Sequence, residues 1–287
     1  MSKASRKNAL VAEVVSLSMR IARKYLAPYS HRNSPKKFTQ EQLITCLILK
    51  AYLNKTYRDI VDLLEVTDEL RKRMGLTQVP HYSTLKKFAD RSDTLHIVDC
   101  MLLEIVREFD MESEEAAIDS TGLETTSASA HYKTRSGMQR KKYIKVSVCV
   151  MTATLLPSSL HLSWGPGNDK SEAGSVLAKA SNVNRPQRLL ADAGYDAEWV
   201  HEFCREQWQT ESIIKPAVHR ADGKMNGKYR SQMTEETLQE KNYGRRWLVE
   251  SFMSGLKRTT NSALRSRTEH GLFIEAAMNV LAYALRR

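Results

Sequence analysis

The segment YIKVSVCVMTAT, residues 143–154, decides the fold class. It alternates apolar and polar positions and is rich in β-branched residues, which predicts a β-strand. The first 110 residues differ, because their apolar positions recur at spacings of three and four, as in amphipathic helices. This change of period predicts a helical N-terminal domain followed by an α/β domain.

Four further strands are predicted around this segment, at 116–120, 160–164, 188–192 and 211–215. Helices are predicted after the third strand, with Asp169 or Ser171 as the N-cap and an end at Ala180, and again at 197–207. Two more helices, at about 235–258 and 271–286, end the chain. The order of three strands, helix, strand, helix, strand and helix predicts one α/β layer.

The N-terminal region contains a helix-turn-helix-like pattern. Helices are predicted at 40–53, with Thr39 as the N-cap, at 56–66, at 84–91 after Ser83 as the N-cap, and at 94–109. The cations Lys86 and Lys87 would be exposed on the third of these helices, where a helix-turn-helix unit contacts DNA. Any three-helix bundle produces the same pattern, so a purely structural role remains the alternative.

The net charge of the chain indicates a polyanionic partner, and its cysteines indicate a reducing compartment. The 287 residues carry a net charge of +11, which favours a polyanion such as nucleic acid, although a merely soluble basic protein remains the alternative. The four cysteines are scattered without a CxxC pair, which indicates neither disulfides nor a zinc site. We found no signal peptide or apolar run of membrane-spanning length, so we expect a cytoplasmic protein with no membrane partner.

The segment YGRRWLVESFMSGLK, residues 243–257, combines a carboxylate with cations. Read as one helix at about 100° per residue, it brings its polar residues within roughly 80° of arc, and its apolar residues face the other side. A carboxylate beside phosphate-binding groups suits metal-dependent phosphoryl transfer. A routine surface ion pair at spacing i,i+4 is the alternative. The polar residues are Tyr243, Arg246, Glu250 and Lys257, and the apolar ones are Leu248, Val249, Phe252 and Leu256.

Two aspartates are predicted at the carboxyl ends of strands, where ligands of open α/β sheets bind. Asp119 ends the first predicted strand and Asp192 the fourth. If these strands are neighbours, the two carboxylates converge and Glu250 can complete the group. Three carboxylates suit Mg²⁺ or Mn²⁺. Each aspartate alone could equally be a turn residue.

These motifs resemble those of DDE transposases of bacterial and archaeal insertion sequences, in the groups called insertion sequence four and five. In that family the last catalytic Glu lies in a pattern of Tyr, two residues, Arg, three residues, Glu, six residues and Lys, which residues 243–257 match at every spacing. The segments AIDSTG, residues 117–122, and ADAGYD, residues 191–196, fit the surroundings of the first two catalytic aspartates. One departure is Ser147, since family members often carry Lys-x-His where this chain has Lys145-Val-Ser147.

The resemblance implies a ribonuclease-H-like core, with a mixed five-stranded sheet flanked by helices, over residues 111–287 and an all-helical DNA-binding or dimerisation domain over residues 1–110. It implies a transposase that cleaves the ends of a mobile element and joins the 3′-OH to target DNA. Asp119, Asp192 and Glu250 would be the catalytic residues and would hold two Mg²⁺ ions, with Mn²⁺ as a substitute.

The implied partners are double-stranded DNA and a second copy of the chain on DNA, in a bacterial or archaeal cytoplasm at the nucleoid. A catalytically silent DNA-binding regulator and a structure-specific nuclease on the same core are the alternatives. A basic loop over 133–145 is a further candidate DNA contact, with a disordered basic loop as the alternative. The single residues expected to contact DNA are Tyr243, Arg246, Lys257, Lys145, Arg230, Arg245, Arg258, Lys86 and Lys87.

Overall fold

The computed structural model describes residues 3–110, 112–125, 143–217 and 225–287. The chain divides into two compact units, one of residues 1–105 with 256–287 and one of residues 106–255. The last 32 residues, which the sequence prediction assigned to the catalytic domain, thus pack with the helical unit.

The helical unit is built around α2, Gln40–Tyr52, which is buried on nearly all sides. It packs against α1, Lys3–Tyr25, and α12, Glu269–Arg286. The predicted cap at Thr39 is present as a capping box with Gln42, which satisfies two backbone N–H groups at the helix start. None of the helices in the described parts of the chain is long and apolar enough to cross a membrane.

Three short helices follow in the same unit. They are α3, Tyr57–Val66, α4, Asp68–Met74, and α5, Tyr82–Ala89. The helix α4 was not predicted from the sequence. The cap of α5 is His81, whose Nδ1 accepts from the N–H of Ser83, so the predicted Ser83 cap is wrong by two positions. The helix α6, Thr94–Phe109, has the predicted bounds.

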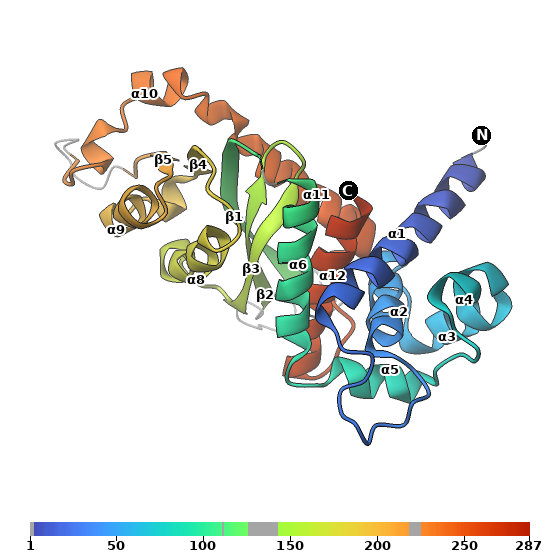
Figure 1. The fold of residues 1–287 in the computed structure, drawn as a ribbon. Helices are drawn as coiled ribbons and strands as arrows, with labels where there is room; N and C mark the ends of the chain where they lie inside the picture. Colours follow the sequence, from blue (N-terminus) through green and yellow to red (C-terminus); the bar gives the residue numbers. More distant parts are fainter. Residues whose placement is uncertain (1–2, 111, 126–142, 218–224) are drawn as a thin grey trace, which may run out of the picture. The chain divides into compact units, whose positions relative to one another are not determined.

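The second unit contains a five-stranded sheet in the order β3-β2-β1-β4-β5. The pairs β1–β2 and β2–β3 are antiparallel, whereas β1–β4 and β4–β5 are parallel. This mixed sheet with its helices confirms the ribonuclease-H-like core predicted from the sequence (Figure 1). The strands are β1, Glu115–Glu124, β2, Tyr143–Met151, β3, Leu156–Gly165, β4, Arg188–Ala191, and β5, Glu211–Ile214.

Helices connect the parallel strands. The helix α8, Asp169–Ser181, packs on β2 and β3, and its N-cap is Asn168 in place of the expected Asp169 or Ser171. The predicted helix over 197–207 is α9, Glu198–Glu202, continued by a π-helical turn, Phe203–Gln207.

The long helix predicted at 235–258 is interrupted. It consists of α10, Glu235–Glu240, a 3₁₀ turn, Tyr243–Arg246, and α11, Trp247–Thr260. Asn242 breaks it with a left-handed backbone, φ 54°, a conformation that asparagine tolerates better than most residues. Tyr243 and Arg246 therefore lie in the 3₁₀ turn before α11, and not on one continuous helix with Glu250 as the sequence predicted.

His201 on α9 is fully buried, and its Nδ1 lies 2.7 Å from the Ser212 hydroxyl. Burial, reinforced by the Arg205 cation, lowers the pKa of His201 to about 4. The folded unit thus disfavours the protonated imidazole, so stability is complete above the ordinary histidine pKa and is lost as the pH falls from about 6.5 towards 4.

Because of this histidine, we expect the free energy of unfolding to fall by about 2 kcal/mol when the pH is lowered from 7 to 5. Urea unfolding at the two pH values measures this loss. His201→Gln should lessen the loss, whereas His270→Gln, at an exposed position of α12, should leave it as in the wild type. An equal loss in the wild type and His201→Gln would contradict the assignment.

Candidate active site

The two predicted aspartates lie on neighbouring segments of the sheet. The parallel pairing of β1 and β4 ends with Ala117 opposite Leu190, and continuing this register by two residues sets Asp119 opposite Asp192. Asp192 follows the last residue of β4, as predicted. Asp119 lies in the middle of β1, not at its end, because β1 continues to Glu124 along β2.

Backbone N–H groups hold both carboxylates. Asp119 Oδ1 accepts from the N–H of Ser120 at 2.8 Å, and Asp192 Oδ1 accepts from the N–H of Gly194 at 2.8 Å. A side chain at position 194 would meet Asp192 Oδ1 and Asp169 Oδ2, each 2.9 Å from an added Cβ. A larger residue at this turn would therefore displace one or both of these carboxylates.

The carboxyl group of Asp119 is affected by burial and by the charged groups around it. Its pKa is raised to about 6, chiefly by burial. The hydrogen bond from Ser120 and the charge of Arg246 oppose this rise, whereas the charges of Asp192 and Glu250 add to it. Asp192 and Glu250 therefore both act electrostatically on Asp119.

Arg246 links two of the three acids. Its Nη1 lies 3.6 Å from Asp119 Oδ2, and its Nη2 donates to Glu250 Oε1. Arg246 is partly buried, whereas the Glu250 side chain is 54% exposed. Both the routine i,i+4 ion pair and the contact with the aspartate site are thus present, since one guanidinium makes both.

Tyr243 belongs to the same electrostatic environment. Partial burial raises the pKa of its phenol, and the charges of Asp192 and Asp119 raise it further, while Arg246 acts in the opposite direction. The apolar side of α11 is buried as predicted through Val249, Phe252 and Leu256.

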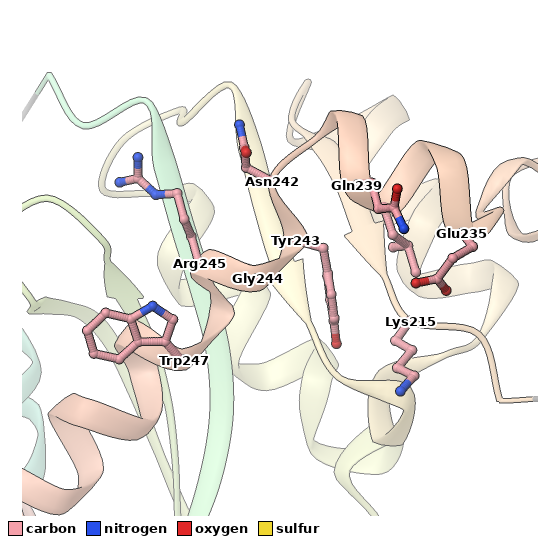
Figure 2. A pocket seen from close by; sticks show the side chains of 9 residues that line it. Lys215, Glu235, Gln239, Asn242, Tyr243, Gly244, Arg245 and Trp247 are labelled. Carbon is pink, nitrogen blue, oxygen red and sulfur yellow. The ribbon is translucent and has the colours of Figure 1, made fainter.

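A groove of about 590 Å³ lies beside Tyr243. Figure 2 shows the Tyr243 ring between Trp247 on one side and Lys215 with Glu235 on the other. The Trp247 side chain is 58% exposed, which is unusual for so large an apolar residue. Sequence analysis assigned no role to Lys215, Glu235 or Trp247, and only their nearness along the chain to Tyr243 could have suggested one.

The acids fit a divalent cation by ligand type and charge, since Mg²⁺ and Mn²⁺ prefer carboxylate oxygens. As the side chains are arranged, no three His, Cys, Asp or Glu residues in the described ranges lie close enough together to hold a metal ion. Positive charge between Asp119 and Glu250 is supplied by Arg246. For these three acids to hold an ion, Glu250 would have to exchange its contact with Arg246 for the ion.

Lys145 does not fit the predicted DNA contact. It is 4% exposed, and its Nζ lies 2.8 Å from Asp169 Oδ1 and 3.2 Å from Glu172 Oε2. It also donates to the carbonyl of Gly167. The ammonium is held inside the unit because it neutralises two acids of α8. The rest of the predicted basic loop, 133–142, lies outside the described residues.

Arg230 and Arg245 also form ion pairs with acidic side chains. Arg230 forms a two-pronged contact with buried Asp196, at 2.7 and 2.6 Å. Arg245 Nε lies 3.0 Å from Glu115 Oε1, and its side chain remains 54% exposed. Arg230 therefore has a structural role that the sequence analysis missed, whereas Arg245 keeps exposed surface.

The remaining predicted DNA contacts lie in the helical unit. Lys257 is partly exposed and Arg258 is exposed, both in the last two turns of α11. Lys86 and Lys87 line a groove of about 660 Å³ on α3 and α5, and Lys86 also pairs with Asp90. The other residues lining this groove are Thr56, Tyr57, Arg58, Tyr82 and Ser83.

Comparison with known families identifies the chain. Residues 111–285 match the transposase DDE domain family, so the chain belongs to that family. Among solved structures, it is similar to a piggyBac transposase in a synaptic complex with hairpin DNA, determined by cryo-EM. That likeness has a TM-score of 0.47 and 10% sequence identity, and it covers 96% of this chain and 71% of the other. Comparison with curated proteins found no match.

Proposed function

We propose that this transposase cleaves DNA at the ends of its own mobile element and joins the released 3′-OH to target DNA. The observation that carries the proposal is the arrangement of the three acids: the β1–β4 register leads to Asp119 and Asp192, and Arg246 contacts both Asp119 and Glu250. Membership of the transposase DDE domain family supports the same reaction class.

Asp119, Asp192 and Glu250 would hold two Mg²⁺ ions, with Mn²⁺ as a substitute. Bound divalent ions would activate the attacking oxygen and stabilise the leaving oxygen of the phosphodiester. Cleavage and joining are both phosphoryl transfers, so one site serves both steps and needs little acid–base chemistry from side chains.

The cations near the carboxylates would position DNA. The Arg246 guanidinium has five donors in a planar fork that matches a phosphate. It would contact a DNA phosphate once Glu250 is occupied as a metal ligand. Tyr243 would contact the strand near the cut. Lys257, Arg258 and Arg245 would neutralise neighbouring phosphates, and we expect two copies of the chain to bring two ends together.

The proposal is tested with a plasmid that carries the coding region and its flanking DNA. Purified protein and Mg²⁺ should produce breaks at fixed inverted repeats, leaving 3′-OH ends that join a second plasmid. Breaks without joining would indicate a nuclease, and binding to the repeats without breaks would indicate a silent regulator. Cutting that is equally efficient in EDTA would contradict the metal-dependent site.

The groove on α3 and α5 is the proposed DNA-backbone surface of the helical unit. The Arg58 guanidinium lies 5.0 Å from the Tyr82 ring centroid, and this pair joins Lys86 and Lys87 at one hollow. Aromatic rings next to cations are typical of nucleic-acid surfaces.

We expect Lys86→Ala/Lys87→Ala to weaken binding to any duplex and to lower the slope of log K against log salt by about 2, since each phosphate contact contributes about 0.9. Fluorescence anisotropy at several salt concentrations measures this slope. Lys72→Ala, at an exposed position of α4, is the control. A salt slope identical to that of the wild type would exclude the groove as a backbone contact.

A further inference from the structure

A chain of hydroxyl groups, buried at Ser147 and Tyr195 and partly buried at Ser120, links the two aspartate segments. The Ser120 hydroxyl lies 2.8 Å from the Ser147 hydroxyl and 2.8 Å from the Tyr195 hydroxyl. Ser120 directly follows Asp119, and Tyr195 ends the 3₁₀ turn that Asp192 caps. Beyond the last β1–β4 backbone pair at Ala117, this side-chain contact therefore ties one aspartate segment to the other.

The hydrogen bonds that join these hydroxyl groups can all form in only one donor–acceptor direction. Glu172 accepts from Ser147 at 2.8 Å and from Ser163 at 2.6 Å. A serine has a single proton to donate, so Ser147 can only accept from Ser120. Ser120 has then used its own proton, and Tyr195 must donate to it. The hydrogen bonds run from Tyr195 through Ser120 and Ser147 to Glu172.

The two residues at the ends of this hydrogen-bond chain, Glu172 and Tyr195, are both buried. Glu172 is 7% exposed, and its carboxylate is held beside the ammonium of Lys145. Tyr195 is 1% exposed, and burial holds the pKa of its phenol above the ordinary value, so the phenol keeps its proton. A charged acceptor at one end and a neutral donor at the other give the chain a fixed direction.

We propose that Tyr195 is a positioning residue, whose hydroxyl, through Ser120, sets the separation of the Asp119 and Asp192 carboxylates for the divalent cation. This inference rests on the proposed function, because it concerns the same metal ligands. A phenol is suited to this task because its ring is locked by burial and its one proton has one acceptor. Ser147 and Glu172 support the contact by directing the proton of Ser120 away from Tyr195.

The test is the affinity of the full chain for Mn²⁺, read from the EPR signal of the free and the bound ion without DNA. We expect Tyr195→Phe to weaken Mn²⁺ binding about tenfold, the lower range for partners of metal ligands, and to change the spectrum of the bound ion. Tyr52→Phe, at another buried tyrosine, in the helical unit, is the control.

A second pair of variants guards against misfolding. Ser120→Ala removes the acceptor of the Tyr195 proton, and Ser120→Thr keeps a hydroxyl at the same place, so the threonine variant should bind Mn²⁺ more tightly than the alanine variant. Thermal unfolding checks that the variants are folded. A structural role alone would alter melting temperature without this difference in Mn²⁺ affinity.

The outcomes separate the two proposals. Wild-type Mn²⁺ affinity in both Tyr195→Phe and Ser120→Ala, with loss in Asp192→Asn, would overturn the positioning role and leave the metal site intact. Wild-type affinity in Asp119→Asn and Asp192→Asn, or no Mn²⁺ binding by the wild-type chain, would overturn the proposed metal site and with it this inference.

Discussion

Asp119→Asn is expected to reduce metal-dependent DNA cleavage by at least about a thousandfold while leaving DNA affinity within about twofold of the wild type. Asparagine keeps the shape of the side chain but removes the charge that a divalent cation needs, and such ions supply several kcal/mol of transition-state stabilisation. Asp192→Asn and Glu250→Gln should have the same effect, since Asp119 is coupled to both acids.

Single-turnover cleavage of a labelled end duplex, with affinity measured separately in Ca²⁺, provides the measurement. Glu202→Gln, at an exposed position of α9, is the matched control and should cleave like the wild type. Asp119→Asn should also fold at least as stably as the wild type, because a buried carboxylate near two others is unfavourable. Cutting that persists in any of the three variants would remove that residue from the site.

Arg230→Ala should destabilise the fold by about 3–5 kcal/mol, because it leaves the carboxylate of Asp196 buried without its cation. Asp196 is 2% exposed and accepts from Arg230 and from the N–H of Ala217. Burial alone would raise the pKa of Asp196, but the hydrogen bonds from Arg230 and Ala217 lower it below the ordinary value.

The stability that this pair provides is therefore complete above the ordinary aspartate pKa and is lost as the pH falls through the lowered one. Urea unfolding at pH 7 measures the cost. Arg230→Lys should recover only part of it, since lysine cannot make the two-pronged contact. The double variant Arg230→Ala/Asp196→Asn should also recover part of the lost unfolding free energy, because it removes the unpaired buried charge. A cost below about 1 kcal/mol for Arg230→Ala would mean that the pair is not structural.

The sequence predicted the sheet well because its strands hold apolar runs bounded by turn residues, and β2 is also rich in β-branched residues. It also placed Asp192 directly after a strand and Glu250 on a late helix, whereas Asp119, expected at the end of a strand, lies in the middle of β1. Whether β1 and β4 are neighbours is a property of topology, which no local pattern encodes. The structure supplies that adjacency.

The errors have physical reasons. The helix over 235–258 looked continuous because helical periodicity carries no information about one left-handed residue, and Asn242 breaks it. Lys145 and Arg230 looked like DNA contacts because a cation shows only its charge in the sequence. Their acidic partners, Asp169 and Asp196, become visible only after folding.

The directed hydrogen bonds from Tyr195 to Glu172 also limit how this chain can diverge. A substitution at position 120, 147 or 172 changes which neighbour donates and which accepts, so a single change leaves a buried group without a partner. Compensation requires a second change in the same set, on another strand or on α8. We therefore expect positions 120, 147, 172 and 195 to covary in related transposases, even though they are distant along the chain and only position 120 adjoins one of the proposed catalytic aspartates.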